Sequence, residues 1–155
     1  MTTIVLLHGT FDLLHYGHHC LFKAARRYGS KVVVTVTADA FVNKGSGRPI
    51  FNEYERAEMI RDLRCVDHVE IVRAKTGVPA IEKFRPTYYA KGADYRRVDK
   101  HGALGLERHA VEALGGKLIF IDTPQWSSTE LITRISKWKE KNETGARREA
   151  ARRSA

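Results

Sequence analysis

Cysteine is scarce in this chain, and that scarcity excludes several classes of protein. Cys20 and Cys65 are the only two cysteines among 155 residues. Neither belongs to a CxxC pair or to the Cys/His spacing of a zinc ligand set, so the sequence indicates neither a disulfide scaffold nor a structural metal site. We expect both to be buried, small apolar side chains in a reducing compartment, and we predict a cytoplasmic protein.

Long apolar runs are missing as well. No stretch approaches the ~18 apolar residues that a membrane-spanning helix needs. The first residues, Met1–Ile4, lack the basic segment that opens a signal peptide. The sequence also has no internal repeat. We therefore expect one globular domain with no membrane partner.

Acidic residues are outnumbered by basic ones, 18 Asp and Glu against 27 Lys and Arg, which gives a formal net charge of +9. Residues 139–155 hold six of the basic residues and three Glu, so this stretch supplies +3 of the total. The remaining charge is spread over residues 1–138, where a site for phosphates accounts for part of it. We predict a domain over 1–138 and a basic, frayed tail over 139–155, and we do not expect nucleic acid to be the main partner.

Short β-branched and apolar runs alternate with helical patterns, which is the rhythm of a parallel sheet covered on both faces. The predicted strands are 3–8, 31–37, 68–72, 87–90 and 117–121, and the predicted helices lie near 17–28, 53–64, 78–84, 104–114 and 128–140. Asn52 and Glu55 form a capping pair before the second helix, and Gly115 stands where the fourth should end. We predict an α/β fold with a Rossmann-like, doubly wound, parallel five-stranded sheet, whose ligands bind just beyond the carboxyl ends of the strands.

Two histidines stand at the expected start of the first helix, within residues 9–18, which read GTFDLLHYGH. His15 and His18 are three apart and project from one face of the first turn. Gly17 lets a phosphate approach the backbone, and the helix N-terminus adds free N–H groups and partial positive charge. Two ordinary histidines at a helix start are the plainer interpretation. The preceding strand and the GTFD segment favour a cradle for nucleotide phosphates.

Residues 9–18 resemble the GxFDxxHxGH motif of the cytidylyltransferase-like nucleotidyltransferases. The similarity continues through Arg48–Ile50, Glu55-Arg56 and Val66-Asp67, which recur in glycerol-phosphate cytidylyltransferases and in the nucleotidyl domain of ADP-heptose synthases. Residues 89–95, YAKGADY, are most similar to the VKGGDY of the heptose enzymes. Residues 127–129, SST, with ITRI at 132–135, are similar to the segment that opens the family's last helix.

This resemblance implies transfer of an NMP unit from CTP or ATP to a small phosphorylated substrate, namely a sugar, polyol or alcohol phosphate, with release of pyrophosphate. Catalysis then depends on positioning and charge stabilisation, with His15, His18 and Lys44 as the catalytic residues. Mg²⁺ is expected to arrive with the triphosphate, held by phosphate oxygens and water. We expect no metal ligands from the protein. The resemblance also allows a homodimer, since members of the family are commonly dimers.

Substrate-binding residues are expected after the strands and at the start of the last helix. They are Gly9, Thr10, Phe11, Asp12, Gly17, Arg48, Lys91, Gly92, Asp94, Ser127, Ser128 and Thr129. For Asp12 a turn residue and a substrate contact are equal alternatives. For Ser127–Thr129 the plainer interpretation is a helix cap, and one hydroxyl can cap while another binds phosphate.

A non-catalytic nucleotide-binding regulatory protein, using its basic tail to bind nucleic acid, is the alternative from another class. The simultaneous presence of HxGH, Lys44 and the SST segment favours the enzyme. The sequence leaves open the choice between CTP and ATP and the identity of the acceptor.

Overall fold

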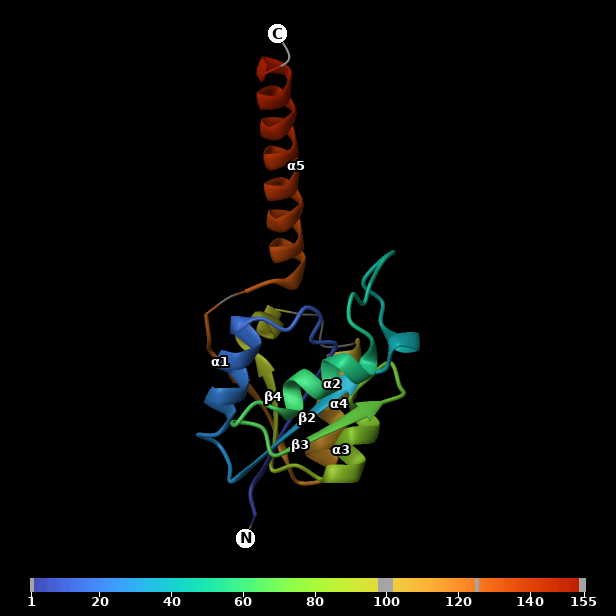
Figure 1. The fold of residues 1–155 in the computed structure, drawn as a ribbon. Coiled ribbons are helices and arrows are strands. Elements are labelled where there is room, and N and C mark those ends of the chain that lie inside the picture. The colour runs from blue at the N-terminus through green and yellow to red at the C-terminus, as the bar shows by residue number, and fades with distance from the viewer. Residues whose placement is uncertain (1, 98–101, 125, 154–155) are drawn as a thin grey trace. The chain divides into compact units, whose positions relative to one another are not determined.

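The computed structural model describes residues 2–97, 102–124 and 126–153, and within them strands alternate with helices (Figure 1). The strands are β1 (Ile4–Gly9), β2 (Lys31–Thr37), β3 (His68–Val72), β4 (Tyr88–Gly92) and β5 (Lys117–Ile121). The helices are α1 (Tyr16–Ala25), α2 (Glu53–Arg61), α3 (Val78–Phe84), α4 (Ala103–Ala113) and α5 (Ser128–Arg153), with 3₁₀ turns η1 (Asp39–Phe41) and η2 (Ala93–Arg97).

The five strands form one parallel sheet in the order β3-β2-β1-β4-β5. This confirms the predicted Rossmann-like, doubly wound fold. The strand order reverses between β1 and β4, which pair from Val5 opposite Tyr88 to Leu7 opposite Ala90. Parallel sheets of this kind bind ligands beyond the carboxyl ends of the strands at such a reversal. The segments that follow β1 and β4 are therefore the first places to look for a site.

Both faces of the sheet are buried, because alternate side chains of each strand point to opposite sides. Val5 and Leu7 pack in one apolar cluster with Phe22 of α1 and Ile60 of α2. Leu6, between them, belongs to a second cluster with residues of α3 and α4, including Ile81 and Val111. Each such side chain contributes roughly 1.5–3 kcal/mol when it leaves water. The helices α1 and α2 thus cover one face and α3 and α4 the other.

The helix ends agree in part with the predictions. Asn52 and Glu55 form the expected capping box at α2, and Gly115 follows α4 with a φ of +80°, a left-handed conformation that suits glycine. The 3₁₀ turns were not expected, and α5 extends well beyond residue 140 to Arg153. Cys20 and Cys65 are free thiols, but they are half-buried rather than fully buried.

The chain divides into two compact units, Met1–Gln125 and Trp126–Ala155. The first unit contains the whole sheet, and the second consists mainly of α5. Among the described residues, no helix has both the length and the apolar character needed to cross a membrane. The division into a domain over 1–138 and a tail over 139–155 stays a prediction.

A buried polar group lies on the face of the sheet that α3 and α4 cover. His8 contacts Thr35 Oγ1 through Nδ1 at 3.0 Å and Thr37 Oγ1 through Nε2 at 3.3 Å. Because Thr35 also donates its hydroxyl proton to the carbonyl of Leu7, His8 donates from Nδ1 and accepts at Nε2. Burial, followed by the positive charge of Lys91, lowers the pKa of His8 to about 4, so the ring is neutral and both of its nitrogens have partners.

An ion pair completes this group. Lys91 Nζ lies 3.1 Å from Glu107 and donates to the carbonyl of His8 at 3.2 Å, while Glu107 accepts the N–H of Gly77 at 2.7 Å. The Lys91 and Glu107 side chains are 9% and 3% exposed. Burial lowers the pKa of Lys91, and the carboxylate of Glu107 acts against that shift. The pair therefore joins the ends of β1 and β4 to the start of α3 and the middle of α4.

Removing one partner of this ion pair should destabilise the fold more than replacing both partners with apolar residues. Glu107→Ala leaves a buried ammonium without its partner, and we expect the free energy of unfolding to fall by about 3–5 kcal/mol in urea titrations. Lys91→Met combined with Glu107→Leu should recover most of this loss. Glu112→Ala, on the exposed side of the same helix, should change stability by only about 0.5 kcal/mol or less. A Glu107→Ala protein as stable as this control would contradict the prediction.

Candidate active site

The segment after β1 carries the predicted histidine motif into α1. Phe11 has a φ of 52°, a left-handed conformation unusual for a bulky residue, and its buried ring folds back so closely that a Cβ on Gly9 would lie 3.0 Å from it. His15 is the N-cap of α1, and its Nδ1 accepts the backbone N–H of His18 at 3.3 Å. Gly17 is buried in the first turn, which contains no acidic residue. The helix N-terminus thus retains its positive end for an anion.

The two histidine rings form one unit. Their centroids are 3.6 Å apart with an interplanar angle of 15°, and the Phe11 ring lies perpendicular to that of His18 with a centroid distance of 5.2 Å. Burial, then the neighbouring His15 and Lys44, lowers the pKa of His18 to about 3. Burial also lowers the pKa of His15, with a further contribution from Lys44. Both rings are therefore neutral near pH 7.

His18 Nδ1 is buried and has no hydrogen-bond partner among the described residues. A buried polar atom without a partner loses its interaction with water and gains nothing in return. His15 is different, because its Nδ1 is already an acceptor, so the proton of the neutral ring sits on Nε2. The pair can therefore donate to an incoming oxygen from His15 Nε2 and still has an unsatisfied nitrogen on His18.

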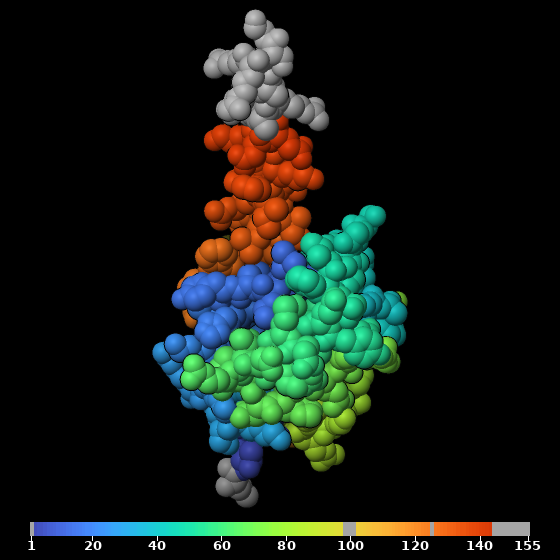
Figure 2. Space-filling view, in the orientation of Figure 1, coloured from blue at the N-terminus to red at the C-terminus, as the bar shows by residue number. Residues whose placement is uncertain are grey.

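Lys44 lies in the loop between η1 and α2, which projects from the body of the first unit (Figures 1 and 2). Gly45 and Gly47 in this loop have φ values of +89° and +76°, which glycine adopts without strain. The charge of Lys44 is among the causes that lower the pKa values of His15 and His18. Its ammonium is therefore near enough to act on the protonation of both imidazoles, and its catalytic role stays a prediction.

Partial burial and then the Arg48 charge lower the pKa of Lys44, while Asp12 acts in the opposite direction. A cluster of this kind, with cations near neutral imidazoles at a helix N-terminus, is complementary to a polyphosphate. His15 and His18 stack on each other, the charge of Lys44 acts on the pKa of both, and the charge of Arg48 acts on the pKa of Lys44.

Asp12 is completely buried, and protein groups engage both of its carboxylate oxygens. Oδ2 accepts Arg48 Nε at 2.8 Å and the N–H of Ile50 at 2.9 Å, and Oδ1 accepts the N–H of Phe51 at 3.1 Å. Arg48 also donates to the carbonyl of Asp12. Burial acts to raise the pKa of Asp12, but these hydrogen bonds outweigh it and hold the pKa below its usual value. The carboxylate joins two loops of the protein.

Arg56 is a further residue of the site region, and it was not predicted to be part of it. Its side chain is fully buried and donates to the carbonyls of Thr10 at 2.6 Å, Thr37 at 2.9 Å and Phe51 at 2.9 Å, besides pairing with Asp39. A signal existed in the sequence, since Arg56 lies next to Ala57 and four residues before Ile60, on the buried face of α2.

The predicted residues Lys91 and Gly92 lie at the end of β4, and Asp94 lies in η2. Lys91 is directed to Glu107 and the His8 carbonyl on the α3/α4 face. The exposed Asp94 lies against Gly92, where an added Cβ would be 2.4 Å from its Oδ1. Gly92 therefore makes room for Asp94. A role for these three residues in ligand binding stays a prediction.

Ser127, Ser128 and Thr129 belong to the second unit. Ser127 Oγ accepts the N–H of Glu130 at 3.4 Å, as a helix cap does, and α5 begins at Ser128. The carbonyl of Thr129 accepts the hydroxyl of Thr133 at 2.9 Å. The contact of these hydroxyls with phosphates stays a prediction.

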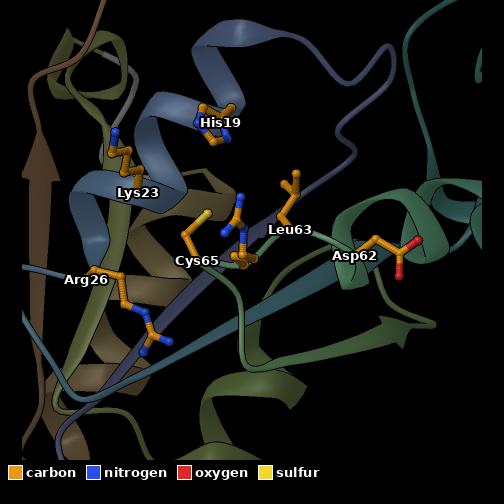
Figure 3. Close-up of a pocket in the computed structure, with 7 residues that line it drawn as sticks. His19, Lys23, Arg26, Asp62, Leu63 and Cys65 are labelled. Carbon is orange, nitrogen blue, oxygen red and sulfur yellow. The ribbon is translucent and has the colours of Figure 1, made fainter.

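A pocket of about 550 Å³ lies between α1 and the segment that follows α2 (Figure 3). Its lining residues are His19, Lys23, Arg26, Asp62, Leu63, Arg64 and Cys65. His19 and Lys23 of α1 and Arg26, its C-cap, recur at helical spacing. None of the three is a predicted site residue. Neither His15 nor His18 is among the lining residues.

Comparison with known proteins identifies the family. The profile of the family described as cytidylyltransferase-like matches residues 6–134. The bifunctional protein HldE of Syntrophotalea carbinolica is 36% identical over 136 residues, which are 86% of this chain and 27% of that protein. HldE of Koribacter versatilis is 38% identical over 132 residues, 83% of this chain and 26% of that protein. The chain thus spans about a quarter of the length of these curated relatives.

Solved structures share the fold. A lipopolysaccharide core biosynthesis protein from Thermoplasma volcanium superposes with a TM-score of 0.65 at 23% identity, covering 82% of this chain and all of that one. Pantothenate synthetase from Thermus thermophilus superposes with a TM-score of 0.58 at 16% identity, covering 83% of this chain and 61% of that one. The profile match extends over most of the chain, and the chain therefore belongs to the cytidylyltransferase-like family.

Proposed function

We propose that the chain transfers a nucleotidyl group from CTP or ATP to a small phosphorylated acceptor and releases pyrophosphate. The observation that carries this proposal is the stacked pair of neutral imidazoles at the N-terminus of α1, with Lys44 beside it. A sugar phosphate is the acceptor we favour. Residues 89–95 resemble the heptose enzymes, and a structural relative is described as a lipopolysaccharide core biosynthesis protein.

In the proposed reaction an oxygen of the acceptor's phosphate attacks the α-phosphorus of the nucleotide. The bond between the α-phosphorus and the oxygen bridging to the β-phosphate breaks, and pyrophosphate leaves in line with the attack. No covalent bond to the protein is needed, so the protein contributes by positioning and charge stabilisation. His15 Nε2 donates to a phosphate oxygen without requiring a proton from solvent, because the neutral ring already carries its proton there.

Lys44 supplies the permanent charge in this proposal. As the attacking and transferred phosphates approach each other, negative charge accumulates where Lys44 lies beside the imidazoles. A compact ammonium on a flexible chain can contact oxygens of both groups. Its loop, with left-handed glycines on either side of Ser46, suits a segment that closes over bound substrate.

Mg²⁺ enters this scheme with the nucleotide. No three His, Cys, Asp or Glu side chains group as a metal site in the part of the chain that the structure describes. The carboxylate of Asp12, close to the imidazoles in sequence, is already engaged by Arg48, Ile50 and Phe51. The ion would therefore be held by phosphate oxygens and water, where it offsets the charge of the leaving pyrophosphate.

A pyrophosphate-release assay tests the proposal directly. Each of the four common NTPs is incubated with Mg²⁺ and a panel of sugar, polyol and alcohol phosphates. We expect release with CTP or ATP only when a phosphorylated acceptor is present, and none with the same acceptors lacking phosphate. Nucleotide binding by calorimetry without release for any acceptor would contradict the enzyme and support a nucleotide-binding regulatory protein.

Loss of one imidazole donor should reduce turnover. We expect His18→Ala and His15→Ala each to lower kcat by ~10²-fold or more, the scale of removing one transition-state donor. His19→Ala is the matched control, because His19 lies on the same helix and lines the pocket described above. It should retain kcat within about twofold, and equal kcat in all three variants would remove the histidine pair from the mechanism.

Lys44 should act mainly in the transition state. Lys44→Ala is expected to lower kcat by ~10²-fold or more while nucleotide affinity, measured by calorimetry, falls much less. Lys44→Arg should rescue poorly, because a planar fork does not replace a compact ammonium among crowded phosphates. Asn43→Ala, the exposed neighbour in the same loop, serves as control. Wild-type kcat in Lys44→Ala would exclude the residue from catalysis.

A further inference from the structure

The loop that carries Lys44 has little packing of its own. Residues 43–47 are exposed, and a Cβ built on Gly45 or Gly47 would meet nothing within 4 Å. Fixing a free backbone costs roughly 1–2 kcal/mol for each residue. The place of Lys44 therefore depends on whatever holds the ends of this loop.

The carboxyl-terminal end of the loop is held by Asp12. Arg48, Ile50 and Phe51 all donate to its buried carboxylate, at 2.8, 2.9 and 3.1 Å. The Arg48 side chain is itself only 9% exposed, and it also donates to the Asp12 carbonyl. We call this set of contacts the Asp12 anchor. Hydrogen bonds to a buried charged group are among the stronger ones in proteins.

The same residue belongs to the histidine segment. Asp12 follows Phe11, whose ring packs against His18, and it lies three residues before His15, the N-cap of α1. On the other side of the anchor, Arg48 lies four residues after Lys44. One carboxylate therefore connects the segment with the imidazoles to the segment with the lysine.

We propose that Asp12 is a positioning residue, whose contacts with Arg48, Ile50 and Phe51 hold Lys44 beside His15 and His18. This inference rests on the proposed function, in which Lys44 acts on the transferred phosphate. It assigns to Asp12 a role other than a turn residue or a substrate contact, and it makes Arg48 part of the same anchor. Because Asp12 acts through Lys44, its removal should matter only while Lys44 is present.

A double-mutant cycle on kcat tests this dependence. The four proteins are wild type, Asp12→Asn, Lys44→Ala and the double variant. Asp12→Asn is nearly isosteric, but it removes the charge that pairs with Arg48 and brings an amide N–H toward other donors. We expect losses of ~10-fold or more for Asp12→Asn and ~10²-fold for Lys44→Ala, with no additional loss in the double variant beyond Lys44→Ala.

Losses that multiply in the double variant would overturn the proposal, because Asp12 would then act independently of Lys44. Wild-type kcat in Asp12→Asn would overturn it as well. Absence of pyrophosphate release from the wild-type chain with every acceptor is a different result, since it contradicts the proposed function. Arg48→Lys keeps the positive charge but loses the planar fork that contacts the Asp12 carboxylate and carbonyl, and it gives the same cycle if Asp12→Asn does not fold.

A second measurement is independent of activity. Cleavage by trypsin after Lys44 requires the loop to leave its anchored conformation, so we expect it to be ~10-fold faster or more in Asp12→Asn than in wild type. Glu55→Ala is the matched control, because it breaks the capping box of α2 and lowers stability by about 1 kcal/mol without touching the loop. Equal cleavage rates in Asp12→Asn and Glu55→Ala would overturn the anchor even in an inactive protein.

Discussion

The buried guanidinium of Arg56 is the interaction on which the rest of the site depends. It is the largest fully buried side chain of the described residues, and its charge cannot be relieved by deprotonation. It is stable there because its donors meet the carbonyls of Thr10, Thr37 and Phe51 and the carboxylate of Asp39. Those groups come from the segments after β1, after β2 and before α2. One side chain thereby gathers the loops that carry the histidines and Lys44.

His8, which is buried, and His18, which is half-buried with a buried Nδ1, show how the structure separates a structural ring from a candidate functional one. Burial keeps both His8 and His18 neutral, with pKa values of about 4 and about 3. His8 has a partner on each nitrogen, Thr35 and Thr37, and it joins neighbouring strands. His18 has a buried nitrogen without a partner and lies against His15 at a helix N-terminus. Burial of a histidine does not by itself indicate a functional site. Burial of a ring nitrogen that has no hydrogen-bond partner does.

Most of the fold followed from apolar periodicity, and the bounds of β2, β3 and β5 agree with prediction because each is a short apolar run between turn signals. Charged side chains in the core were harder to predict. Glu107 lies three residues after Leu104 and four before Val111, on the buried face of α4, and Arg56 has a similar position on α2. Both follow helical spacing, but charged residues are so rarely buried that spacing alone does not identify them.

The direction of Lys91 has a similar explanation. Ala90 belongs to the cluster under α1 and α2, whereas Tyr89 belongs to the cluster under α3 and α4. By the period of two along a strand, Lys91 shares the side of Tyr89, opposite to Ala90. The sequence motif correctly places the residue at the reversal of strand order, but the pleat directs its ammonium to Glu107. The motif predicts where along the chain Lys91 lies, whereas the pleat of the strand decides toward which face of the sheet its side chain is directed. Its partner there, Glu107, is found only in the structure.

The buried side chains of Arg56 and Asp12 also limit how far the Lys44 loop can move. Arg56 holds Asp39 before the loop, and Asp12 holds Arg48 after it. Backbone hydrogen bonds from Phe41 to Ala38 and from Val42 to Asp39 extend the first of these attachments. The exposed residues 43–47 lie between them. In the proposed function, closing over a nucleotide would order five residues, at roughly 1–2 kcal/mol each. Phosphate contacts with an ammonium and two neutral imidazoles are of a size to offset this cost. The anchors limit the ordering cost to these residues, because Arg56 and Asp12 already hold the two ends of the loop.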